Sequence, residues 1–294
     1  MGISFNQLAF LLYVKKFGNF NKTITLGRQN LDPSKRLAKL LLPSISKYKE
    51  YIYADRLLEE YFHSSIVDSV DVSDYEGATI IHDMNKPLPN ELKGQYDTVI
   101  DSGTLEHVYN VPQALKNCSL LCKPGGQIIH MLPANNVCGH GFWQMSPELF
   151  FSFYSVKNGY KDTEVYLAKS LENKYFYRVI EPKKGERVEI RSSLPVNAFV
   201  RTVLGEKGFS HENVQQSDYT YLWLHGKPIT KNESKMSIFK NFLEDFPQMY
   251  YLAVPINNLV TTTFFKFTGT HMLSKSNRQI VRIKMPHKVE VMKN

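Results

Sequence analysis

Short apolar segments alternate with helix-like segments between residues 22 and 133. Runs rich in β-branched residues are separated by stretches whose apolar residues recur every three or four positions, a pattern typical of βαβ units around a mainly parallel sheet. The predicted strands, in chain order from Lys22 to Pro133, are KTITLG, SIVDSVDVS, ATIIHDMN, YDTVIDSG and QIIHMLP. Five strands in this order predict a doubly wound, Rossmann-like α/β sheet.

Helices are predicted between and before these strands. FNQLAFLLYVKKF predicts an N-terminal helix within residues 1–21. After the first strand, Asp32-Pro33 has the form of a helix cap with proline at the first helical position, followed by the periodic KRLAKLLL. LEHVYNVPQALKNCSLLCK predicts a turn and a helix, and Pro124-Gly125-Gly126 then turns the chain into the fifth strand.

The pattern becomes less regular after Pro133. SPELFFSFYSVKNGY is typical of a helix, EVYLAKS, YFYRVIEP and RVEIRSS are typical of strands, and IVRIKM indicates one more strand in a basic tail from Ser274 to Asn294. We therefore divide the chain into a first domain, residues 1–155, and a C-terminal elaboration, residues 156–294. The elaboration is expected to cap the site of the first domain or to bind substrate.

Composition and charge narrow the class of protein. With 43% hydrophobic and 22% charged residues, the 294-residue chain has the composition of a globular protein. Its longest apolar runs fall short of the roughly 20 residues that span a bilayer, and no secretory signal is evident, so we expect a cytoplasmic protein. The net charge of +8 comes from residues 156–294, with 22 Lys and Arg against 13 Asp and Glu. That excess indicates either an acidic partner or a solvated basic face.

Three cysteines, Cys118, Cys122 and Cys138, lie close together in the sequence. An odd number without a second paired cluster favours buried, reduced thiols over a metal site. Asp97, Asp101 and His130 are a second conceivable metal set. Asp97 and Asp101 begin and end one strand, however, which places them too far apart to share an ion, so no metal is predicted.

Polar residues gather where the predicted strands end, and ligands of doubly wound sheets bind at that edge. Gly27 ends the first strand, Asp71 and Asp83 end the second and third, and Asp101-Ser102-Gly103 ends the fourth. A ligand that contains ribose and adenine needs a carboxylate for the ribose hydroxyls, a polar group beside the adenine amine, and a glycine turn for close backbone approach. Asp71, Asp83 and Gly27 fit these roles in that order, although strand-end acids also serve as turn or helix caps.

Two segments resemble a known family. YDTVIDSGTLEHV and LLCKPGGQIIHMLP resemble the fourth- and fifth-strand signatures of class I S-adenosylmethionine-dependent methyltransferases, with their Leu-Glu-His step and Lys-Pro-Gly-Gly turn. HMLPANNVCGHGFWQMSPELFF further resembles a bacterial subgroup often found with surface-polysaccharide genes. The resemblance covers residues 22–155. It implies S-adenosyl-L-methionine as cofactor and O-methylation of a small-molecule or glycan acceptor. The cofactor-binding residues that it implies are Gly27, Asp71, Asp83, Asp101, Ser102, Gly103 and Glu106.

The turn after the first strand departs from the family pattern. The expected G-x-G-x-G is replaced by TLGRQNLD, in which only Gly27 remains and Arg28 follows it. Arg28 either points outward, so that Gly27 alone provides the close backbone approach to the cofactor, or fills the cofactor space. The second case defines a competing hypothesis, a non-catalytic binding or scaffold protein with this fold.

Histidines are the candidate general bases for methyl transfer to a hydroxyl. His140, flanked by Gly139 and Gly141 beyond the fifth strand, is the first candidate, and His107 of the Leu-Glu-His step is the second. His130 lies inside an apolar strand and is expected to be a satisfied core residue. The segment Phe142–Gln144 is expected either to line the acceptor pocket or to belong to the core.

The sequence disfavours two further classes of enzyme. The basic second half suggests a nucleic-acid methyltransferase, but the Asn-Pro-Pro-Tyr-like step that holds a flipped base is replaced by Asp101-Ser102-Gly103-Thr104, which argues against a nucleic-acid partner. A nicotinamide-dependent oxidoreductase is disfavoured because the G-x-G-x-x-G turn is missing. The sequence does not define the oligomeric state.

Overall fold

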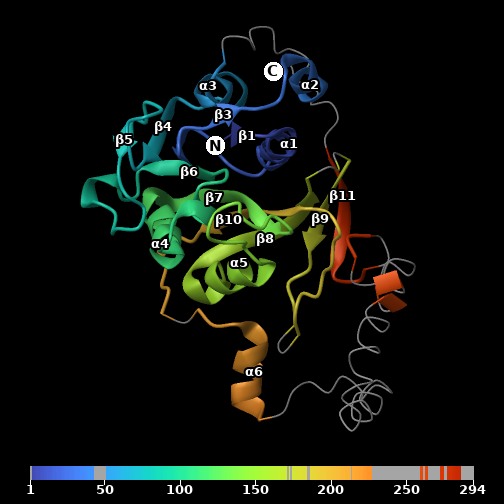
Figure 1. Cartoon of the computed structure of the whole chain (residues 1–294). Coiled ribbons are helices and arrows are strands. Elements are labelled where there is room, and N and C mark those ends of the chain that lie inside the picture. The colour runs from blue at the N-terminus through green and yellow to red at the C-terminus, as the bar shows by residue number, and fades with distance from the viewer. Residues whose placement is uncertain are drawn as a thin grey trace.

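One large sheet runs through the described part of the protein (Figure 1). The computed structural model describes residues 2–42, 51–170, 172, 174–183, 186–212, 214–226, 259–260, 262–263, 272–274 and 277–285. Within them the nine-stranded sheet has the order β11-β9-β8-β10-β7-β6-β2-β4-β5. Its strands, in chain order, are β2 (Lys22–Leu26), β4 (Ile66–Asp71), β5 (Ile80–Ile81), β6 (Tyr96–Asp101), β7 (Cys122–Asn135), β8 (Tyr160–Lys169), β9 (Tyr175–Val179), β10 (Val196–Leu204) and β11 (Ile280–Lys284).

The strands of the first half form the predicted doubly wound sheet. β2 lies at its centre and pairs in parallel with β4 on one side and β6 on the other, while β5 and β7 extend the two sides in parallel. The chain order therefore reverses at β2, and the carboxyl ends of β2 and β6 lie side by side. This is the edge at which ligands of such sheets bind.

The third predicted strand is much shorter than expected. Only Ile80–Ile81 pairs with β4, followed by one more backbone bond from His82 N–H to the carbonyl of Asp71. The Asp83 carboxylate then accepts from Asn85 in a turn that leads away from the sheet. The remaining first-half strands occur where the pattern predicted them.

Residues beyond 155 continue the same sheet rather than building a separate one. β10 lies between β7 and β8 and is antiparallel to both, and β9 and β11 extend that edge. β8, β9 and β11 were predicted, whereas β10 was missed. The predicted strand RVEIRSS is wrong, since Arg191 makes only an isolated bridge to Met272. The part of the tail after residue 285 lies outside the described residues.

Helices cover both faces of the sheet (Figure 1). One face packs against α1, α2 and α3 through a core that includes Phe10 and Phe199, and the other against α4 and α5 through a core that includes Ile128 and Phe150. A further helix, α6, follows the last long strand. The helices are α1 (Phe5–Val14), α2 (Lys35–Leu41), α3 (Asp55–Phe62), α4 (Val111–Leu121), α5 (Pro147–Phe153) and α6 (Ser217–His225).

The predicted cap of α2 is wrong by two residues. Ser34 caps the helix, its side chain accepting from Leu37 N–H, and α2 begins at Lys35. Asp32 instead follows a two-stranded parallel sheet of β1 (Gly2–Ile3) and β3 (Asn30–Leu31), and its N–H donates to the carbonyl of Ile3. This pairing draws the N-terminal segment across the ligand-binding edge.

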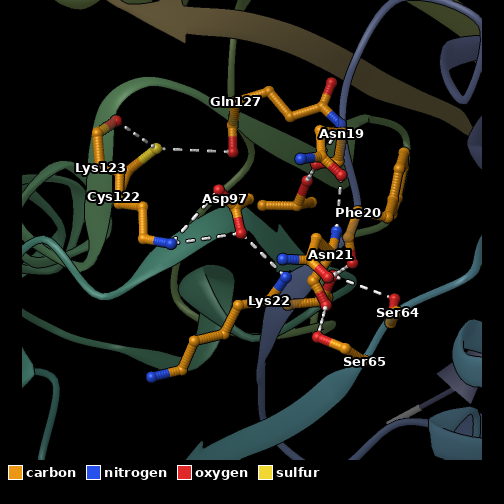
Figure 2. Close-up of polar contacts among 12 residues, drawn as sticks. Asn19, Phe20, Asn21, Lys22, Ser64, Ser65, Asp97, Cys122, Lys123 and Gln127 are labelled. Atoms are coloured by element: carbon orange, nitrogen blue, oxygen red, sulfur yellow. Dashed lines mark hydrogen bonds and ion pairs between the residues drawn. The ribbon is translucent and has the colours of Figure 1, made fainter.

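Figure 2 shows the opposite, amino-terminal end of β2 and β6. There Asp97 accepts from the backbone N–H of Lys22 at 2.9 Å and lies 3.3 Å from Lys123 Nζ. Asp101 lies at the other end of β6, so the two carboxylates do not share an ion. The predicted separation of Asp97 and Asp101 at the two ends of one strand is thus confirmed.

The cysteines match the predicted thiols in two of three cases. Cys118 and Cys122 are free and buried in the core around α4. Burial raises the pKa of Cys122 to about 12, so the thiol is protonated and unreactive at neutral pH. Cys138 is free but exposed, which the sequence pattern did not predict. No helix in the described part of the chain is long and apolar enough to cross a bilayer.

His211 makes the stability of this fold pH-dependent. It stacks on Phe153 at 4.0 Å and is hydrogen-bonded to the hydroxyl of Tyr160 at 2.8 Å. Burial, together with the positive charge of Lys116, lowers the pKa of His211 to about 4. The unfolded chain therefore binds more protons than the folded one between about pH 4 and 6.5, so stability falls as the pH drops through this window. Urea unfolding at several pH values checks this expectation, and His211→Gln is expected to flatten the profile there.

Candidate functional site

A cavity of about 530 Å³ lies at the carboxyl ends of β6 and β7. Such a volume is within the usual range of small-molecule sites. The N-terminal segment with Asp32, the turn after β6, and β7 with the loop that follows it form most of the cavity, and Ser170 after β8 and Asn197 of β10 complete it. The polar residues that line it are Ser4, Asn6, Gln7, Asp32, Ser102, Glu106, His107, His140, Ser170 and Asn197.

The N-terminal wall was not predicted as part of the site. Ser4 caps α1 in a capping box with Gln7, and the Gln7 side chain also donates to the carbonyl of Met131 at 3.4 Å. The Asn6 amide donates to the carbonyls of Lys169 and Glu172. The Ser-x-x-Gln spacing signals the helix start in the sequence. Nothing in the pattern signals the β1–β3 pairing that places this helix start on the cavity.

A fully buried network lies beneath the cavity floor. Asp101 ends β6, and one of its carboxylate oxygens accepts from Thr104 N–H at 3.0 Å and from Leu105 N–H at 3.3 Å. The other lies 2.9 Å from His130 Nδ1, and His130 Nε2 lies 2.6 Å from the hydroxyl of Tyr154. His130 is thus a satisfied core residue, as predicted. The network fixes the 3₁₀ turn of residues 105–107 that follows.

Glu106, in that turn, has an unusual environment. Its side chain is only 1% exposed, and its Oε2 atom has no hydrogen-bond partner among the described residues. Oε1 lies 3.6 Å from His140 Nε2. Burial first, and then the negative charge of Asp101, raise the pKa of Glu106 to about 8. In the protein without a bound ligand this carboxyl therefore keeps its proton near neutral pH.

Two glycines place His140 against this turn. Gly139 and Gly141 have φ of +84° and +91°, a region that favours glycine. A Cβ at Gly141 would lie 2.7 Å from the carbonyl oxygen of Glu106. The same carbonyl accepts from the N–H groups of Phe142 and Trp143 at 2.7 and 3.2 Å. The loop is therefore held on the turn by close backbone contact.

His107 lies beside His140, with 5.5 Å between the ring centroids. Burial, and then the positive charge of His140, lower the pKa of His107, which favours the neutral ring. The ligand atoms of Glu106, His107 and His140 all lie within 4.8 Å of one another. The structure thus brings both predicted catalytic histidines together with one predicted cofactor residue.

The segment Phe142–Gln144 does not line this cavity. Phe142 and Trp143 are exposed and pack around Tyr109, and the indole N–H of Trp143 donates to the carbonyl of Val108 at 3.1 Å. The expectation that these aromatics belong to the core is wrong, because both are exposed, whereas a role in acceptor binding stays a prediction. These aromatics anchor the loop to the outside of the turn.

The predicted cofactor residues fall into two groups. Ser102, Gly103 and Glu106 line the cavity, and Asp101 lies buried below it. Gly27, Asp71 and Asp83 do not line it. Gly27 has φ of +67° at the end of β2, Asp71 accepts from Val72 N–H at the end of β4, and Asp83 accepts from Asn85 beyond β5. Hydrogen bonds from Asn85 lower the pKa of Asp83.

Arg28 spans the gap between these strand ends. Its guanidinium donates to Asp55 at 2.9 Å and to the carbonyls of Glu76 and Gly77 at 3.0 and 3.1 Å, and it lies 4.1 Å from the centre of the Tyr53 ring. Arg28 therefore ties the turn after β2 to the start of α3 and to the loop after β4. It does not line the 530 Å³ cavity.

No protein-family model matches this chain, and no curated protein matches it. Similar solved structures include the CMeT domain of the citrinin polyketide synthase, at 12% identity and a TM-score of 0.39, covering 69% of this chain and 52% of that one. A SAM-dependent methyltransferase from Thermotoga maritima has 12% identity and a TM-score of 0.37, covering 69% and 90%. The N-methyltransferase NodS from Bradyrhizobium japonicum has 10% identity and a TM-score of 0.38, covering 68% and 94%.

This chain thus spans about half the length of the first of these proteins. The second and third are named as methyltransferases, the class that the fourth- and fifth-strand segments resemble. Function does not transfer at such similarity, so the activity of this chain has to be derived from its own site.

Proposed function

We propose that this protein is an S-adenosylmethionine-dependent methyltransferase that acts on a hydroxyl of a small molecule or glycan. The observation that carries the proposal is the cavity at the edge where the doubly wound sheet reverses, with Ser102, Gly103 and Glu106 on one wall and His140 and His107 beside them. Two sequence segments that resemble the methyltransferase signatures, YDTVIDSGTLEHV and LLCKPGGQIIHMLP, end on this cavity or border it.

The residues present fit the cofactor. Ser102 Oγ and Glu106 Oε2 are buried polar atoms without a hydrogen-bond partner among the described residues, and both belong to residues that line the cavity. Buried polar atoms of this kind are usually satisfied, so they favour a polar ligand. Asp71 and Asp83 would hold the ribose and the adenine, and Gly27 would allow close backbone approach; all three lie outside the cavity, at or beyond the neighbouring strand ends.

Bound S-adenosylmethionine supplies an activated methyl group, and the protein has to align the acceptor and remove its proton. His140 is exposed on the cavity side and lies within reach of Glu106, so its ring would accept the hydroxyl proton. The fixed loop around Gly141 would hold that ring in place. The N-terminal wall from Gly2 to Gln7 would exclude water from the acceptor.

Isothermal titration calorimetry tests the proposal directly. The wild-type chain is expected to bind S-adenosylhomocysteine with one site, and Asp71→Ala to weaken binding by about tenfold or more, because the ribose hydroxyls lose their acceptor. Asp74→Ala, in the same loop, is the matched control and should bind as the wild type does. Lack of binding by a folded wild-type chain would remove the proposed function.

The position of Arg28 leaves open one alternative to a methyltransferase, namely a non-catalytic binding or scaffold protein of the same fold. Its guanidinium reaches from the turn after β2 to the carbonyls of Glu76 and Gly77 in the loop after β4. If Arg28 only positions that turn, Arg28→Ala is expected to weaken cofactor binding by about three- to tenfold. If it fills the cofactor space, the same variant gains affinity. Arg36→Ala, an exposed change on α2, serves as control.

A further inference from the structure

Three side chains at the cavity have the composition of a metal site. Glu106 and His107 are consecutive in the turn after β6, and His140 comes from the loop after β7. Their ligand atoms all lie within 4.8 Å of one another, and His140 Nε2 lies 3.6 Å from Glu106 Oε1. A tetrahedral ion bound at about 2.0–2.1 Å holds its ligand atoms about 3.4 Å apart. Small side-chain rotations of the two exposed histidines would close the difference.

The environment of Glu106 independently indicates a missing partner. Its side chain is almost completely buried, yet Oε2 has no hydrogen-bond partner among the described residues and the residue lines the cavity. An unpaired polar atom of this kind is costly and calls for a bound group. A cation coordinated by Glu106 would satisfy the carboxylate and offset the free-energy cost of burying it.

The backbone holds the three residues ready. Asp101 fixes the start of the turn by accepting from Thr104 and Leu105, and the carbonyl of Glu106 binds the loop that carries His140. Ligand positions that exist before the ion arrives lower the cost of binding. This arrangement distinguishes the set from a chance meeting of exposed side chains.

We propose that Glu106, His107 and His140 bind a divalent transition-metal ion, with zinc as the probe of choice. Two imidazole nitrogens and one carboxylate suit zinc, cobalt or ferrous iron, whereas magnesium and calcium prefer oxygen ligands. Three protein ligands would leave at least one coordination position open, and all three residues line the cavity. These three residues differ from Asp97, Asp101 and His130, the conceivable metal ligands that the strand spacing argued against.

An open position on the ion gives the site a way to activate an acceptor. A hydroxyl bound to the ion would lose its proton to solvent water more readily, so both histidines would then act as ligands and not as the base. This use of the ion rests on the proposed function. The binding of the ion does not.

The test uses the full-length chain, treated with a chelator and then dialysed against zinc. Mass spectrometry of the metal content is expected to give one ion per chain, and cobalt to give the visible absorption bands of a low-coordinate site. Glu106→Gln, His107→Ala and His140→Ala are each expected to lower zinc affinity at least about 100-fold, more than the loss of an outer-shell contact. His82→Ala changes a half-buried histidine that does not line the cavity. This variant is the control and should bind as the wild type does.

The outcomes separate this inference from the proposed function. Glutamine is the neutral counterpart of a protonated Glu106, so Glu106→Gln should keep its fold, which circular dichroism checks. A folded wild type without stoichiometric zinc, or zinc affinity unchanged in Glu106→Gln and His140→Ala, overturns the inference. Zinc binding that persists in a protein without affinity for S-adenosylhomocysteine supports the metal site while the proposed function fails.

Discussion

Asp101→Ala is expected to lower the free energy of unfolding by about 3–5 kcal/mol, the usual cost of removing one partner from a buried charged network. The fully buried carboxylate accepts from two backbone N–H groups, those of Thr104 and Leu105, and binds His130. After truncation all three groups are left without an acceptor in a dry environment. Urea unfolding measured at neutral pH checks the loss.

Asp97→Ala provides the matched control, since it removes the same side chain from the other end of β6. Asp97 is partly exposed and pairs with Lys123, an interaction worth about 1 kcal/mol or less, besides accepting one backbone N–H (Figure 2). Its loss should therefore be clearly smaller. Equal losses for the two variants would contradict the view that burial of the Asp101 network, and not the strand position, determines the effect.

Gly141→Ala is expected to reduce methyl transfer by about 100-fold while most of the fold is kept, because misplacing a catalytic group by about 1 Å costs that much. The new Cβ would lie 2.7 Å from the carbonyl oxygen of Glu106, so the loop has to move away from the turn. His140 moves with it. Initial rates with a chosen acceptor measure the loss, and zinc titration reports the same displacement without turnover.

Gly139→Ala is the control that separates the effect of the close Cβ contact at Gly141 from the effect of backbone strain. Both glycines have positive φ, so each alanine carries a similar strain of about 1–2 kcal/mol. A Cβ at Gly139, however, would meet nothing within 4 Å. Gly139→Ala should therefore keep most of the activity. A loss as large as that of Gly141→Ala would attribute the effect to loop strain alone.

The sequence predicted the part of the fold in which local pattern and structure agree. Apolar, β-branched runs bounded by turn residues form β2, β4, β6 and β7. The turn residues on both sides mark where each of these strands begins and ends. β10 was missed because VNAFVRTVL has no alternation. It lies between β7 and β8 and is buried on both faces, including the charged Arg201, which bonds to Gln127 and to the carbonyl of Phe17.

The sequence predicted which residue types form the site better than it predicted how distant segments come together there. Sequence spacing placed Ser102, Gly103, Glu106 and His107 at one strand end, where the structure has them. The approach of His140 depends on the backbone contact at Gly141, and the N-terminal wall depends on a two-residue parallel pairing with β3. Both are contacts between distant segments, which residue periodicity does not encode.

The position of β10 also has a consequence for biosynthesis. The edge of β7 is complete once Asn135 has left the ribosome, but its antiparallel partner ends at Leu204. At about 5–20 residues per second, translation leaves that apolar edge uncovered for roughly 3–14 seconds. An unpaired strand edge recruits other chains. Slower translation at low temperature lengthens this exposure. Chaperones that shield the nascent β7 should therefore improve recombinant expression of this protein more than slower translation does.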